Sequence, residues 1–265
     1  MVKNSFQKSV VLFMTLSFFT LLIVSCKKDK ETVPTQTTDA PETYKAQVTG
    51  KWIVGDGSTR IAANTSGYSS FEFTGSGSYI ITKTDNTCLT GFYTIDSTNN
   101  IITLRALGST VGVITIAKLG NTVMNFALRL TGTSTDITIF SSKTGSIVST
   151  SSRTDSLCQT WAMVTRFQNG VEDIVIKDSI QSGFIKATVI ISSMGTFLTV
   201  AEQKGVATQY NSGSWSWANG SQTTINTGST SGGQVAFVNG NFQLTYTAPA
   251  PASITIKEVY QKVIQ

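Results

Sequence analysis

Residues 91–104 read GFYTIDSTNNIITL, two runs of alternating apolar and polar side chains on either side of the polar turn DSTNN. Successive side chains of a strand point to opposite faces, so each run predicts a half-buried β-strand. A turn rich in Asp and Asn between two such runs is typical of antiparallel neighbours. This stretch therefore predicts consecutive antiparallel strands.

The same alternation continues outward along the chain, in SFEF (70–73), VITI (113–116) and VMNFAL (123–128). Charged residues make up only 13% of the chain, while Gly, Ser and Thr are abundant among Val, Ile and Phe. That mixture favours short strands joined by tight turns over helices. We expect an all-β protein built as antiparallel meander barrels or sandwiches.

The pattern occurs twice. Four features of the first half recur in the same order in the second, at offsets that drift only by loop-sized amounts: Trp52 with Trp161, Gly77-Ser78-Tyr79 with Gly195-Thr196-Phe197, Gly91-Phe92-Tyr93 with Gly213-Ser214-Trp215, and Asp136–Ile139 with Ser253–Ile256. We interpret this as a duplication, with one small β domain at 49–145 and another at 156–265. The polar segment 141–156 separates the copies. In the second copy, an insertion near 168–183 is expected to form either a strand or a short helix over Val171–Ile180.

The N-terminus has the three parts of a secretory signal peptide. Lys3 and Lys8 precede the apolar run 10–24, which is too short to span a bilayer as a helix, and Ser25-Cys26 follow it. The alternative is an uncleaved anchor helix in which Cys26 has no role. Residues 26–48 mix charge, Thr and Pro without apolar periodicity and predict a flexible tether.

Leu22-Ile23-Val24-Ser25-Cys26 resembles the lipobox of bacterial lipoproteins. The resemblance implies cleavage after residue 25 and lipid attachment to Cys26, where several acyl chains, palmitate among them, would form a lasting anchor. The expected location is the cell envelope, at the outer membrane, on its periplasmic or its surface face. The charged cluster 27–31 is similar to surface-export signals, or is simply a solvated run of charges.

Each half has an early Trp, a Gly-x-aromatic turn, an aromatic strand opening with Gly, and a final alternating run. With the lipobox, this resembles the lipocalin-like lipoproteins of Gram-negative bacteria, and Gly50-Lys51-Trp52 matches the lipocalin Gly-x-Trp signature. The resemblance implies tandem small barrels in which Trp52 has a structural role. At about 95 residues each, one barrel is expected to be closed and the other closed, open or flattened.

Composition argues against several functions. The chain has no histidine, which removes the commonest catalytic base and zinc ligand. Loss of Lys3 and Lys8 with the signal leaves 18 Lys and Arg against 15 Asp and Glu, a net charge of +3 that is too mild for nucleic acid. Glu172 and Asp173 are adjacent acids that point apart on a strand. We expect no enzyme, metal or cofactor.

Trp215 and Trp217 lie two apart on a predicted strand, so their rings share a face, with Tyr210 nearby. Paired indoles either stack on a sugar, line an apolar cavity or form part of the core. Cys88 and Cys158 occupy non-matching positions, so they either pair between the domains or stay as buried thiols. We expect a non-enzymatic binding or scaffold lipoprotein for a small apolar or amphiphilic ligand. The alternatives are a glycan binder and a module that docks a neighbouring protein.

Overall fold

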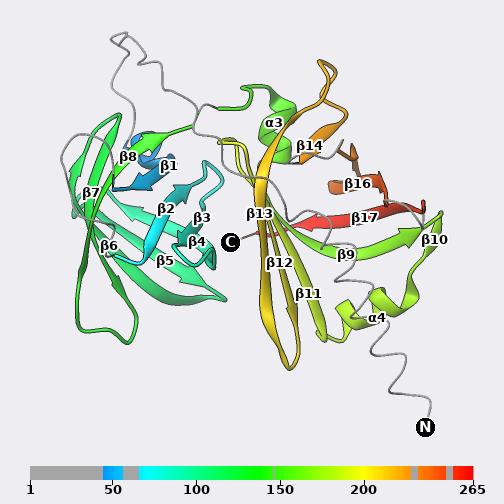
Figure 1. Ribbon diagram of the computed structural model, residues 1–265, viewed down its shortest axis with the longest axis horizontal. Helices are drawn as coiled ribbons and strands as arrows, with labels where there is room; N and C mark the ends of the chain where they lie inside the picture. The colour runs from blue at the N-terminus through cyan, green and yellow to red at the C-terminus, as the bar shows by residue number, and fades with distance from the viewer. Residues whose placement is uncertain (1–43, 56–65, 146, 228–231, 249–252, 265) are drawn as a thin grey trace.

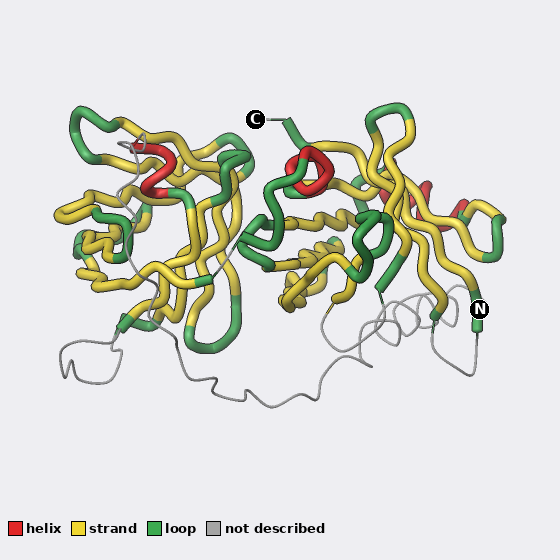
Figure 2. Tube along the Cα trace, turned by 90° about the horizontal axis from the view of Figure 1, so that it is seen from above, coloured by secondary structure: helices red, strands yellow, loops and turns green. Residues whose placement is uncertain are grey.

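The computed structural model describes residues 44–55, 66–145, 147–227, 232–248 and 253–264. It shows two antiparallel β-barrels side by side (Figures 1 and 2). The all-β prediction with two tandem small barrels is confirmed. The expected signal peptide, Cys26 and most of the expected tether lie outside the described residues.

Barrel 1 is an eight-stranded meander, closed by antiparallel pairing of its first and last strands. A closed sheet leaves no edge strand exposed. Its strands are β1 (Gly50–Val54), β2 (Tyr68–Phe73), β3 (Ser78–Lys83), β4 (Cys88–Asp96), β5 (Ile101–Ala106), β6 (Ser109–Leu119), β7 (Val123–Leu130) and β8 (Ile137–Thr144). Gly91 lies inside β4, which begins at Cys88, and not at its start as the sequence predicted. Any Cβ at Gly91 would collide with the carbonyl oxygen of Arg105 on β5, which explains the glycine at this position.

Barrel 2 repeats this meander with an insertion after its first strand. Its strands are β9 (Thr160–Gln168), β10 (Val171–Glu172), β11 (Ile185–Ile191), β12 (Thr196–Gln203), β13 (Val206–Trp217), β14 (Ile225–Thr227), β15 (Gln234–Val238), β16 (Asn241–Thr247) and β17 (Thr255–Lys262). β17 pairs with β9, and an isolated bridge between Thr224 and Gln234 connects the two remaining ends. Barrel 2 is therefore nearly closed.

A short helix precedes the first strand of each barrel: α2 (Tyr44–Val48) before β1, and α3 (Ser152–Leu157) before β9. In both, the indole N–H of a tryptophan four residues on donates to the last helical carbonyl. Trp52 bonds to Val48 and Trp161 to Leu157, each at 2.9 Å. The tether predicted to reach residue 48 is thus wrong at its end, because Val48 is buried in the core and Tyr44–Val48 is helical.

The two barrels also share a tight turn and a backbone hydrogen bond between that turn and the strand that follows. Gly77 and Gly195 both have positive φ, +88° and +82°, which favours glycine. Each accepts a backbone N–H on its carbonyl, from Tyr93 at 2.8 Å and from Trp215 at 2.7 Å respectively. These contacts bear out the correspondence of the early tryptophans, the turns and the aromatic strands. In the final strands, Lys143 pairs with Trp52 and Lys262 pairs with Trp161, so these two lysines are equivalent. The predicted match between 136–139 and 253–256 is therefore wrong by two residues.

The insertion of barrel 2 contains both elements that the sequence left open. β10 pairs with the end of β9, and α4 (Ile174–Gln181) follows at once. β11 pairs with β9 over three residue pairs only, Thr160–Ala162 with Thr188–Ile190, so the two strands separate below Thr188. α4 packs against β9 and β11 at that separation (Figure 1).

Candidate functional site

The interior of barrel 1 is filled by its own side chains. Trp52, Phe71 and Phe73 are fully buried, and Phe71 packs edge-on against Phe126 at 4.9 Å between ring centroids. Lys143 closes over the Trp52 ring, with Nζ 5.1 Å from its centroid. The interior of barrel 1 is packed in this region, and Trp52 is a core residue.

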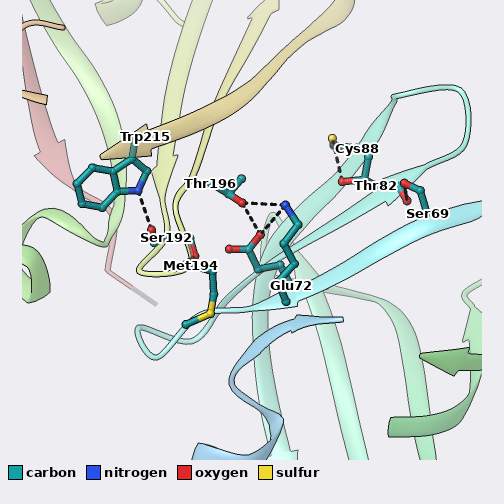
Figure 3. A network of polar contacts seen from close by, with 9 residues as sticks. Ser69, Glu72, Thr82, Cys88, Ser192, Met194, Thr196 and Trp215 are labelled. Atoms are coloured by element: carbon teal, nitrogen blue, oxygen red, sulfur yellow. Dashed lines mark hydrogen bonds and ion pairs between the residues drawn. The ribbon is translucent and has the colours of Figure 1, made fainter. Parts of the chain in front are cut away.

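Trp215 and Trp217 do lie on the same face of β13, but that face is the interior of barrel 2. Their rings meet edge-on at 5.5 Å, and Trp215 is only 3% exposed. Trp215 Nε1 donates to the carbonyl of Ser192 at 2.7 Å (Figure 3), and Trp217 Nε1 donates to Thr154 Oγ1 at 2.9 Å. A ring that stacks on a sugar must present an open face, which Trp215 does not.

Tyr210 is not part of this aromatic pair. It lies an odd number of residues from Trp215 and Trp217 on β13, with cross-strand partner Val200. Val200 belongs to a cluster outside the barrel interior, so Tyr210 faces the other side of the sheet. The structure brings the two tryptophans together and leaves Tyr210 apart from them.

A polar cluster occupies the interior of barrel 2 beside β9. Glu258 accepts a hydrogen bond from Tyr246 Oη at 3.1 Å and one from Tyr260 Oη at 2.6 Å. Burial raises the pKa of the Glu258 carboxyl, although both hydrogen bonds and the nearby charge of Arg166 act to lower it. Burial and the Glu258 charge raise the pKa of both tyrosines well above the usual value. Arg166 is the direct cross-strand neighbour of Glu258.

Arg166 connects this cluster to helix α4. Its Nη2 contacts Asp173 Oδ2 at 2.6 Å, and the two side chains are only 12% and 15% exposed. Asp173 also accepts from Gln168 Nε2 at 2.9 Å and, as the N-cap of α4, from the backbone N–H of Ile176 at 3.2 Å. Arg166 Nε is buried and has no hydrogen-bond partner among the described residues. An unpartnered buried donor is costly, and an oxygen of a bound molecule would satisfy it.

A pocket of about 450 Å³ lies where β9 and β11 separate under α4. Much of its lining is apolar and the rest is charged or polar: Ala162, Met163, Ile180, Phe184 and Ile185, with Lys186, Glu202, Gln203 and Lys204. Lys186 pairs with Glu202 at 3.5 Å. Met163 is the cross-strand neighbour of Tyr260, so the pocket and the polar cluster share β9 and lie at opposite ends of α4.

Glu172 and Asp173 hold α4 in place. Glu172 bonds to Lys177 at 2.9 Å and to Thr165 at 3.0 Å, whereas Asp173 bonds to Arg166. The hydrogen bond from Lys177 is the largest influence on the pKa of Glu172, which is lowered. These two acids therefore have partners that anchor the insertion to β9.

Cys88 and Cys158 are free and buried. Cys88 lies between the barrels, while Cys158 belongs to the core of barrel 2. Burial raises the pKa of both thiols, that of Cys158 to about 12. A thiol that stays protonated is a poor nucleophile. Of the two alternatives for this pair, the structure shows free thiols.

Within the described ranges, no group of three or more His, Cys, Asp and Glu side chains is arranged to hold a metal ion. No helix in the part of the chain that the structure describes is long and apolar enough to span a membrane.

Sequence reasoning missed the polar cluster around Arg166 and Glu258. A signal was present in Ile256-x-Glu258-x-Tyr260, where period two puts a carboxylate on the same face as two large apolar groups. That alternation cannot show whether the shared face is buried. Arg166 also comes from β9, a strand that is distant in sequence from β17 and pairs with it only when the barrel forms.

Comparisons with known proteins give no assignment. No protein-family model matches the chain, and no curated protein matches it significantly.

Proposed function

We propose that this chain is a non-enzymatic envelope lipoprotein whose second barrel binds a small amphiphilic molecule and whose first barrel serves as a scaffold. The observation that carries the proposal is the partly apolar pocket at the C-terminal end of α4, together with Arg166 at the other end of that helix, whose buried Nε has no partner among the described residues. Small-molecule sites combine an apolar wall with a few convergent polar groups. The apolar part of the ligand would occupy the pocket, and a polar oxygen would accept from Arg166.

The asymmetry between the barrels supports this division of roles. The interior of barrel 1 is filled with aromatic rings and aliphatic side chains, whereas the interior of barrel 2 contains an ionisable cluster. A buried ionisable cluster costs stability, so its presence favours a functional role. The absence of histidine and the raised pKa of the cysteine thiols support binding over catalysis.

Native mass spectrometry of the chain from Lys27 onward, purified from the periplasm of a host cell, tests this proposal. We expect a reproducible co-purified mass and a shift in the emission of an apolar fluorescent probe. Ile180→Trp fills the pocket and should abolish both signals. Val175 lies on the same helix, is 44% exposed and does not line the pocket. Val175→Trp is therefore the matched control and should retain the co-purified mass and the probe response. A clean apo mass after exposure to envelope extract, with no probe response, would contradict the proposal.

The lipid anchor has its own experiment. Residues 22–26 support lipid attachment to Cys26, and several acyl chains would hold the chain to the outer membrane. Cys26→Ser should move the protein from the membrane fraction to the soluble envelope fraction. If that variant stays in the membrane fraction, the lipoprotein assignment is wrong.

A further inference from the structure

The two barrels meet at a buried face made by one row of outward side chains on each barrel. In barrel 1 cross-strand pairing aligns Lys51 on β1, Glu72 on β2 and Ile80 on β3. In barrel 2 it aligns Thr160 on β9, Ile190 on β11 and Leu198 on β12. The early tryptophans and the tight turns show that these rows occupy the same places in the two barrels, position for position.

The polar contacts across this face are reciprocal. Ser78 Oγ of barrel 1 lies 2.7 Å from Thr160 Oγ1 of barrel 2. Thr196 corresponds to Ser78, and Lys51 corresponds to Thr160. Lys51 Nζ donates to Thr196 Oγ1 at 3.2 Å, which is the same contact made in the opposite direction. A face in which residue i contacts j and j contacts i is isologous, the signature of a twofold axis.

The apolar contacts follow the same symmetry. One cluster is contributed by both barrels: Ile80, Cys88, Ile190, Leu198 and Val200. Ile80 and Leu198 hold equivalent positions on β3 and β12 and meet in this cluster, 2% and 0% exposed, although both point away from their own barrel interiors. Equivalent residues meet only close to a symmetry axis.

The composition of the face differs between the barrels. Cys88 and Val200 of the apolar cluster correspond to Tyr210 and Thr82, which are not part of it, and a charged side chain replaces an apolar one in the aligned rows. Where barrel 2 has Ile190, barrel 1 has Glu72, which is 1% exposed. Glu72 Oε2 accepts from Thr196 Oγ1 at 2.7 Å and lies 3.9 Å from Lys51 Nζ, while Oε1 is buried without a partner among the described residues. The polar side chain is satisfied in part by barrel 2, so the face is matched to this partner.

We infer that the face between the barrels is a pseudo-twofold dimer interface, and that each barrel binds the other through it without the covalent connection. The partner that this surface fits is a second barrel of the same type. The linker then restricts the pair to one chain and is not what holds the barrels together.

Cleavage of the connection tests the inference on the whole mature chain. A protease recognition sequence inserted after Gly145, near the exposed Gly145 and Ile147, allows the chain to be cut between β8 and α3. After complete cleavage, the halves should co-elute in size exclusion and give the summed mass in native mass spectrometry. Two separate species at micromolar concentration, each retaining its β circular dichroism signal, would overturn the inference.

Single substitutions then test the symmetry. Leu198→Asp and Ile80→Asp should each weaken association of the cut halves by about 30-fold or more, as expected for a buried interface anchor. Both side chains leave the barrel interiors untouched, so intact variants should keep their near-UV circular dichroism. Val238→Asp, at a position 43% exposed at the β15–β16 turn, is the control and should leave association unchanged.

Glu72→Ile places in barrel 1 the residue that barrel 2 carries, and the cut halves should remain associated. Dissociation of that variant, or a large loss from only one of Leu198→Asp and Ile80→Asp, would refute the symmetry. No loss from either of those two would refute the interface itself.

Discussion

Two Arg–Asp pairs of this chain have the same spacing and the same contact distance and differ in burial. Arg166 with Asp173 and Arg129 with Asp136 are each seven residues apart, and each pair has its closest nitrogen–oxygen distance at 2.6 Å. The side chains of the first pair are 12% and 15% exposed, against 58% and 44% in the second. Asp173→Asn and Asp136→Asn therefore compare a largely buried pair with an exposed one. The pairs also differ in their hydrogen bonds, because Asp136 accepts two from Arg129, whereas Asp173 accepts one from Arg166 and others from Gln168 and Ile176.

We expect Asp173→Asn to lower the free energy of unfolding of barrel 2 by about 3 kcal/mol. Two unit charges about 4 Å apart interact by roughly 4 kcal/mol at an effective dielectric constant of about 20. The neutral amide recovers about 1 kcal/mol through the hydrogen bonds that its oxygen still accepts. The remainder agrees with the roughly 3–5 kcal/mol that removal of one partner costs a buried ion pair. Asp136→Asn should have no measurable effect, because water screens that pair.

Urea unfolding followed by amide hydrogen exchange and mass spectrometry gives the assay, since peptides of the two barrels are distinguished by mass. The loss should appear first in peptides of α4 and β9. It should also shrink at acid pH. Burial alone would raise the pKa of Asp173, but hydrogen bonds from Arg166 and Ile176 and the Arg166 charge lower it overall. The stability that this carboxylate adds is present above its unfolded pKa and is lost as pH falls through the folded value. Equal, small losses from both variants would refute the reasoning.

Two further predictions concern buried titratable groups. Burial raises the pKa of Glu258 in the folded state, so its contribution to the free energy of unfolding should fall as pH rises from about 4.5 through the folded pKa. Glu258→Gln should remove this pH dependence from the free energy measured by urea unfolding. A pH dependence that persists in the variant would contradict the assignment. Cys88 and Cys158 are buried, so in the native chain from Lys27 onward a thiol reagent should leave them unmodified, and it should modify them in denaturant. The control variant Val238→Cys places a thiol at an exposed position and should react at once. A disulfide in the purified chain would be the contrary result.

Local sequence patterns predicted much of the fold. Alternation in stretches such as 91–104 and the polar turns between them predicted antiparallel strands, because side-chain direction along a strand depends on sequence position alone. The duplication could be seen because Trp52 and Trp161, and the glycines at 77 and 195, meet local requirements: an indole bonded four residues back, and a positive φ. By contrast, α2 and α4 are short helices that are stabilised by packing on the barrels, so no helical periodicity marks them in the sequence.

The sequence by itself determined the strands, their order along the chain and which residues share a face of each strand. Only the tertiary structure decided which face is interior. The alternation of side chains along a strand places Trp215 and Trp217 on the same face, whether that face is interior or exterior. Closure of barrel 2 buries Trp215 and leaves Tyr210 on the outer face. Burial of Glu72 between barrels, and of Arg166 beside Glu258, likewise depends on strands far apart in sequence coming together. Burial is a property of the assembled surface, and no local pattern of residues encodes it.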